Sequence, residues 1–128
     1  MKILLDTHTV LWWVGKHDKL SPVARGILLN NANSLHVSVV SAWEIAIKTS
    51  LGKLPGFAGG AKAFLKQLHN IPAALLPLSP RYIEEVETLP FLHRDPFDRL
   101  LVATAKADGM TLLTADENIR KYDIFSTW

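Results

Sequence analysis

The run Ile3-Leu4-Leu5-Asp6-Thr7 decides the fold class of this chain. Residues 2–5 are short and continuously apolar after the first position, which predicts a strand that a parallel sheet buries on both faces. Asp6 closes this run, so its carboxylate is expected at the carboxyl end of the strand. In a repeating β-α chain these ends meet along one edge of the sheet, where active sites gather.

Strands and helices alternate along the rest of the chain. Helix starts are marked by Ser21-Pro22, Ser79-Pro80 and Asp95-Pro96, where a capping residue precedes a proline at the first helical position. The predicted strands are residues 2–5, 35–40, 73–78, 110–114 and a last edge strand at 124–125. The predicted helices are residues 9–15, 22–31, 41–52, 60–69, 96–108, one opening at Pro80 and a short one at 116–120. We therefore expect an α/β fold in which helices flank a parallel sheet of four to five strands.

The composition indicates one globular domain over residues 1–128. The chain is 48% hydrophobic and 20% charged, with a net charge of +2 and no cysteine, which excludes disulfides and thiolate metal sites. Asp6 and His8 interrupt the apolar start, and no stretch approaches the length of a membrane span, so a soluble cytoplasmic protein is expected. A mean hydropathy of +0.15 suggests that a partner or a second copy covers some apolar surface.

Four acidic residues carry the functional prediction: Asp6, Glu44, Asp98 and Asp116. Each lies just beyond a predicted strand or in the first turn of a predicted helix. Carboxylates gathered at one edge repel each other unless positive charge lies between them. A divalent cation, Mg²⁺ or Mn²⁺, supplies that charge, and metal-bound carboxylates in a crevice indicate phosphate chemistry.

Structural alternatives exist for three of these acids. Asp6 and Asp116 each stand where a helix N-cap is expected. Glu44 lies three residues after Ser41, the spacing of a capping box, and four residues before Lys48, the spacing of an ion pair.

Asp98 is harder to explain structurally. Asp95 already supplies the N-cap of its helix, and Asp98 lies above the apolar residues of 101–105. A carboxylate on such a face is costly unless it is paired or binds a metal. An ion pair with Arg94 or Arg99 is the structural alternative.

Four motifs resemble the PIN-domain nucleases, and within them the VapC-type toxins of toxin–antitoxin pairs. The likeness covers nearly the whole chain, and the acids appear in the family's order. The motifs are Leu4-Leu5-Asp6-Thr7-His8, Ser41-Ala42-Trp43-Glu44-Ile45, His93-Arg94-Asp95-Pro96-Phe97-Asp98-Arg99-Leu100-Leu101 and Leu113-Thr114-Ala115-Asp116.

This resemblance implies a PIN-like three-layer fold and an Mg²⁺- or Mn²⁺-dependent endoribonuclease that cleaves single-stranded or loop RNA. Asp6, Glu44, Asp98 and Asp116 would be both its catalytic and its metal-holding residues. The resemblance also implies a homodimer and a cognate antitoxin, whose flexible segment places an arginine in the acidic site.

Other residues carry weaker predictions. Thr7 and Thr114 are candidates for orienting a carboxylate, and Arg94 and Arg99 for contacting phosphate. Adjacent tryptophans at 12 and 13 cannot both face the sheet, so one of them is expected at an interface. The five histidines show no ligand spacing, which predicts structural or surface roles.

Two other functions compete with the nuclease. A non-catalytic RNA- or protein-binding module on the same fold is the main alternative, although acids without a metal would repel phosphate. A phosphoacceptor receiver domain also places an aspartate after its first strand, but its acidic pair and its lysine after the last strand are missing.

Overall fold

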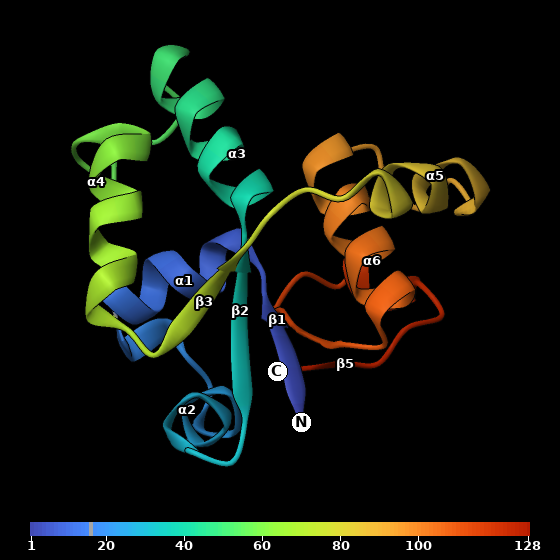
Figure 1. The fold of residues 1–128 in the computed structure, drawn as a ribbon. Coiled ribbons are helices and arrows are strands. Elements are labelled where there is room, and N and C mark those ends of the chain that lie inside the picture. Colours follow the sequence, from blue (N-terminus) through green and yellow to red (C-terminus); the bar gives the residue numbers. More distant parts are fainter. Residues whose placement is uncertain (16) are drawn as a thin grey trace.

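A single parallel sheet organises the computed structural model, which describes residues 1–15 and 17–128 (Figure 1). Within these residues it has five strands in the order β3-β2-β1-β4-β5. The strands are β1 (Lys2–Leu5), β2 (Ser34–Ser38), β3 (Ala73–Leu76), β4 (Thr111–Leu113) and β5 (Ser126–Thr127). Leu5 pairs with Val37 on one side and with Leu113 on the other. The carboxyl ends of β1, β2 and β4 therefore lie next to one another.

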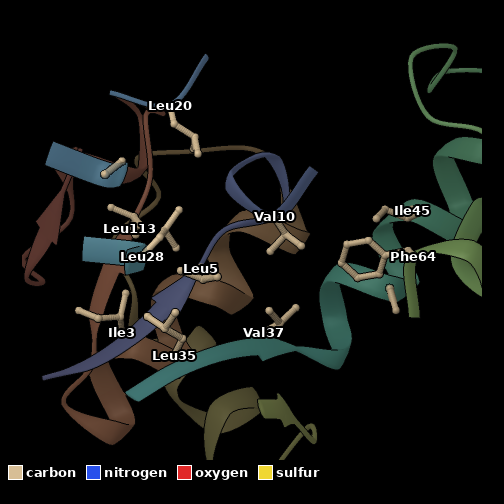
Figure 2. Close-up of a cluster of buried hydrophobic side chains, with 12 residues drawn as sticks. Ile3, Leu5, Val10, Leu20, Leu28, Leu35, Val37, Ile45, Phe64 and Leu113 are labelled. Carbon is tan, nitrogen blue, oxygen red and sulfur yellow. The ribbon is translucent and has the colours of Figure 1, made fainter. Parts of the chain in front are cut away.

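Strand β1 is central because both of its faces are apolar. Ile3, Leu4 and Leu5 are fully buried, and their side chains alternate between two hydrophobic clusters. Ile3 and Leu5 belong to the larger cluster, in which Figure 2 shows the ring of Phe64 pointing toward Val10. Leu4 packs on the opposite face of the sheet.

Helices cover both faces of the sheet, as Figure 1 shows. Helices α1, α2 and α4 lie on one side and α5 and α6 on the other, while α3 contributes to clusters on both. The helices are α1 (Thr7–Val14), α2 (Pro22–Leu29), α3 (Val39–Ser50), α4 (Gly60–Gln67), α5 (Pro80–Thr88) and α6 (Pro96–Asp108), with 3-10 turns at His17–Lys19, Leu68–Asn70 and Ile119–Lys121. The predicted α/β class, with a parallel sheet flanked by helices, is confirmed.

The predicted helix starts at Ser21, Ser79 and Asp95 are also confirmed. Each side chain accepts a hydrogen bond from a backbone N–H in the first turn of its helix. Gly109 ends α6 with φ of 62°, in the left-handed region that favours glycine. These caps fix where α6 begins and so place Asp98 in its first turn.

Several predicted boundaries are wrong by a few residues. The strand predicted at 35–40 ends at Ser38, and Ser38 rather than Ser41 caps α3 by accepting a hydrogen bond from the Val40 N–H at 3.1 Å. Val40 is helical although β-branched, because it packs with Tyr82 and Leu100. Tertiary packing thus overrides the local strand preference there.

Further boundaries differ at other strand and helix ends. The first helix begins at Thr7 because Asp6 caps it, the third strand ends at Leu76, and the last edge strand is at Ser126–Thr127. Ile124, predicted in that strand, instead packs on the core beside α6.

No helix in the described ranges combines the length and the apolar character needed to cross a membrane.

Candidate functional site: an acidic cluster at the sheet edge

Asp6 joins the ends of β1 and β4. Asp6 is the N-cap of α1, which is the structural role that its place in the sequence predicts. Its Oδ1 accepts hydrogen bonds from the Thr9 N–H at 2.8 Å and the Thr9 hydroxyl at 2.9 Å. Its Oδ2 accepts one from the Thr114 hydroxyl. Burial nevertheless raises the pKa of Asp6, because it outweighs these hydrogen bonds. The ionised form of Asp6 is therefore disfavoured at this site, despite the hydrogen bonds that its carboxylate accepts.

Glu44 is held from two sides on α3. Its side chain is buried, with Oε1 2.7 Å from the Thr7 hydroxyl, while Oε2 accepts a hydrogen bond from the Lys48 ammonium. The predicted ion pair with Lys48 is confirmed. The predicted capping box is wrong, because Ser41 lies inside the helix, 2.8 Å from the Thr7 hydroxyl. Thr7 thus orients a carboxylate, as the sequence suggested.

Asp98 lies where the other carboxylates meet. One oxygen from each of Glu44, Asp95 and Asp98 falls within 4.8 Å of the others. Burial, followed by the negative charges of Asp95 and Glu44, raises the pKa of Asp98 to about 7. The structure pairs Asp98 with His93 and not with Arg94 or Arg99, so both predicted alternative partners are wrong.

His93 connects Asp98 to Asp116. Its Nε2 is 2.9 Å from Asp98 Oδ2 and 3.6 Å from Asp116 Oδ2. Asp116 does not cap a regular helix as the sequence predicts. It instead accepts a hydrogen bond from the Asn118 N–H at 2.8 Å in a turn that precedes the 3-10 segment.

His93 lies beside two of the predicted site residues, whereas the sequence predicts only a structural or surface role for it. His93 lies five residues before Asp98 and outside α6, and its spacing in the sequence does not mark it as a ligand. The Asp95-Pro96 helix start is the sequence signal that lies nearest to His93. The side chain of His17 lies outside the described residues.

The structure brings all four acids to one edge of the sheet. Asp6 and Asp116 line a common cavity of about 250 Å³, together with His8, Trp12 and Ala115. The charge of Asp6 also contributes to the raised pKa of Asp98. The cluster therefore runs from Asp6 through Asp116 and Asp98 to Glu44.

The chemistry of this donor set fits a divalent cation. Carboxylate oxygens are the ligands that Mg²⁺ prefers, and an imidazole nitrogen beside them is also compatible with Mn²⁺. Two overlapping groups share Asp98: His93 with Asp116, and Glu44 with Asp95. A bound cation would counter both causes of the raised pKa of Asp98, which are its burial and the repulsion from Asp95 and Glu44.

Comparison with known sequences gives two matches over most of the chain. The family model of the PIN domain matches residues 3–124. Ribonuclease VapC22 of Mycobacterium tuberculosis is 29% identical over 121 residues, which cover 94% of this chain and 91% of that protein.

Solved structures show the same fold. VapBC2 from Rickettsia felis, bound to a DNA fragment from its promoter, matches with a TM-score of 0.72 at 17% identity, covering 99% of this chain and 98% of that chain. DNA-bound VapBC from Salmonella typhimurium matches with a TM-score of 0.68 at 14% identity, covering 99% and 97%. At these identities the likeness establishes a shared fold.

Proposed function

The chain belongs to the PIN domain family, and from this premise we propose that it is a metal-dependent endoribonuclease, the toxin of a toxin–antitoxin pair. We propose that residues 1–128 form a single PIN domain that acts in the cytoplasm. The observation that carries the proposal is the gathering of Asp6, Glu44, Asp98 and Asp116 around one sheet edge. The relative named as a ribonuclease and the toxin–antitoxin complexes of the same fold support it.

Under this proposal Asp6, Glu44, Asp98 and Asp116 hold Mg²⁺ or Mn²⁺. The cation would supply positive charge at the carboxylates and Lewis acidity toward phosphate oxygens and water. The residues of the chain fix the orientation of the carboxylates that would hold the cation. Thr9 and Thr114 engage both oxygens of Asp6, and Thr7 and Lys48 engage both oxygens of Glu44.

These contacts hold each carboxylate in one orientation before a ligand arrives. A side chain that is already fixed loses little conformational freedom when it binds, which favours both metal affinity and alignment of the substrate. Asp98 is held by a contact of 2.9 Å with His93 Nε2, and Asp116 lies 3.6 Å from the same atom.

We propose protein partners on the basis of an exposed apolar stripe on α3. Trp43 is 55% and Ile47 39% exposed on α3, and Leu51 at its C-cap is 60% exposed; their spacing places them on one side of the helix. The exposed tryptophan is thus Trp43, whereas Trp12 and Trp13, which the sequence suggested for an interface, are half-buried. Such a stripe fits a homodimer interface or the cognate antitoxin.

The nuclease proposal is tested with purified protein and a mixture of RNAs. We expect cleavage with added Mg²⁺ or Mn²⁺ and none with EDTA. Asp6→Asn and Asp98→Asn, purified in parallel, report any contaminating nuclease. Metal-dependent cleavage that both variants retain would count against the assigned site, and no cleavage of any RNA would favour a non-catalytic binding module.

The toxin role is tested by expression with and without the neighbouring open reading frame. We expect expression alone to stop growth, Asp98→Asn to restore it, and the neighbouring gene to neutralise the wild-type chain. Light scattering at tens of micromolar tests the dimer, with Ile47→Glu as the disrupting variant. Unimpaired growth with folded protein would contradict the toxin role, and a wild-type monomer would contradict the dimer.

A further inference from the structure

The loop between α5 and α6 exposes apolar side chains beside the acidic cluster. Phe91 is 71% and Leu92 44% exposed. Both line a cavity of about 560 Å³, together with His93, Arg94 and Asn118. His93 also contacts Asp98 and Asp116, so it forms a wall common to the cavity and the acidic cluster. A molecule in this cavity would contact His93, which itself lies beside two of the proposed catalytic acids.

The backbone of this loop is fixed although it is irregular. The Tyr122 hydroxyl accepts hydrogen bonds from the Leu92 N–H at 3.2 Å and from the His93 N–H at 3.1 Å. Tyr122 itself is buried, and it lies about thirty residues further along the chain, so a core residue anchors the loop. The exposed side chains therefore stand on a preformed support.

Phe91 is backed by a cation. The guanidinium carbon of Arg99 lies 4.7 Å from the centroid of the Phe91 ring. Arg99 is itself held by hydrogen bonds to the carbonyls of Val86 at 3.4 Å and Leu89 at 3.3 Å. The sequence suggests that Arg99 contacts phosphate, but in the structure the guanidinium of Arg99 contacts backbone carbonyls and the Phe91 ring. Most of the ring remains open to solvent, as a stacking surface would.

Arg94 has an uncommitted charge. It is exposed, and no ion pair or hydrogen bond engages its guanidinium within residues 1–15 and 17–128. A guanidinium in this state is suited to a phosphate group, to which it can donate two parallel hydrogen bonds. Its place matters because the neighbouring carboxylates repel the phosphates of any nucleic acid that approaches them.

We propose that residues 91–94 form a nucleotide-binding subsite for single-stranded RNA. Phe91 stacks on a base flanking the scissile phosphate, and Arg94 binds an adjoining backbone phosphate. The inference rests on the proposed nuclease function and extends it to a substrate contact. Single-stranded RNA suits the site better than a protein segment does, because the cavity pairs a stacking ring with a free cation and shares His93 with the acidic cluster.

The test measures RNA affinity and cleavage together. Binding of a fluorescent single-stranded RNA is followed in protein made inactive by Asp6→Asn, and kcat and KM are measured in otherwise wild-type protein. Phe91→Ala should weaken binding and raise KM about tenfold, because stacking contributes about 1–3 kcal/mol per base. Phe91→Trp should restore binding. Because Phe91 touches none of the four acids, kcat should stay within about twofold.

Matched controls separate the subsite from general surface effects. Phe125 is 78% exposed immediately before β5, so Phe125→Ala removes a comparable ring without touching the loop. Arg94→Gln should weaken binding several-fold and reduce the dependence of log Kd on log salt by about one. Arg81→Gln is its control, because Arg81 pairs with Asp108 at the far end of α6.

Single abasic positions in the RNA locate the stacked base. With Phe91 present, an abasic substitution at one position next to the cleaved bond should lower the affinity of the RNA. In Phe91→Ala the same abasic substitution should leave the affinity unchanged. This coupling cannot arise from a change in folding alone.

The outcomes distinguish the subsite from the nuclease function. Cleavage with Kd and KM unchanged in both Phe91→Ala and Arg94→Gln would overturn the subsite and leave the nuclease intact. RNA binding that depends on Phe91, without any cleavage, would support the subsite and overturn the nuclease. Absence of RNA binding would overturn both. Loss of binding to the neighbouring gene product, with RNA affinity unchanged, would assign the loop to a protein and overturn the subsite.

Discussion

The Nε2 atom of His93 lies 2.9 Å from Asp98 Oδ2 and 3.6 Å from Asp116 Oδ2. The two carboxylates come from different elements, since Asp98 is in the first turn of α6 and Asp116 follows β4. The imidazole therefore separates two groups that would otherwise repel each other and ties the start of α6 to the end of the sheet. The same ring forms a wall of the cavity beside Phe91 and Arg94.

Asp98→Asn should abolish cleavage and raise the melting temperature of the metal-free protein by a few degrees at pH 8. Burial and the nearby charges of Asp95 and Glu44 raise the pKa of Asp98 to about 7, so its ionised form destabilises the fold at pH 8. An amide keeps the shape without the charge. Thermal unfolding in EDTA measures the effect.

Asp123→Asn is the control for this substitution, because Asp123 is exposed and lies outside the acidic cluster. Asp6→Asn should behave like Asp98→Asn, since burial also raises the pKa of Asp6 and asparagine can still cap α1. A lower melting temperature in both cluster variants would contradict the repulsion argument, whatever happens to cleavage.

The places of Asp6 and Asp98 follow from local signals in the sequence. Asp6 ends an apolar strand, and Asp98 follows the Asp95-Pro96 helix start; both signals depend on a few neighbouring residues. Parallel strand order then brings the strand ends together. This is why the edge at which the acids meet can be predicted without the structure.

His93 could not be predicted in the same way. Its position depends on an irregular loop that is held by the Tyr122 hydroxyl, a contact between distant parts of the chain. The start of α3 is predicted wrongly for a related reason, because Val40 packs with Tyr82 and Leu100 across the fold. Contacts of this kind leave no periodic pattern in the sequence.

Mg²⁺ should raise the melting temperature of the wild-type protein in a concentration-dependent way. A ligand that binds only the folded state stabilises it by RT ln(1 + [L]/Kd), and here it would also relieve the repulsion around Asp98. Chelation with EDTA should reverse the increase and stop cleavage. The shift should be much smaller in Asp98→Asn. An equal shift in this variant would place the cation elsewhere on the protein.

Tyr122→Phe should lower RNA affinity as well as stability. The substitution leaves the backbone N–H groups of Leu92 and His93 without their acceptor, at a cost of about 1–3 kcal/mol if they stay buried. The loop would then hold Phe91 and Arg94 less firmly. Urea unfolding and RNA binding measure the two effects.

Tyr82→Phe provides the matched control for Tyr122→Phe. Tyr82 is also buried, and its hydroxyl donates to Asp108, away from the loop. This variant should lose stability while keeping RNA affinity and KM. If both variants changed RNA affinity equally, the anchoring role of Tyr122 would be excluded.

Asp108 should make a contribution to stability that disappears in acid. Burial raises the pKa of Asp108, but hydrogen bonds from Tyr82 and Arg81 outweigh it, so the pKa lies below its ordinary value. A carboxylate of this kind stabilises the fold above its unfolded-state pKa of about 4, and the contribution is lost as pH falls through the lower folded-state pKa.

Asp108→Asn should therefore lower the free energy of unfolding by about 1 kcal/mol at pH 7, a modest value because the Arg81 side chain is 60% exposed. The difference from wild type in urea unfolding should be the same at pH 7 and pH 5 and should shrink below about pH 4. A difference that stayed constant down to pH 3 would show that shape, and not charge, makes Asp108 stabilising.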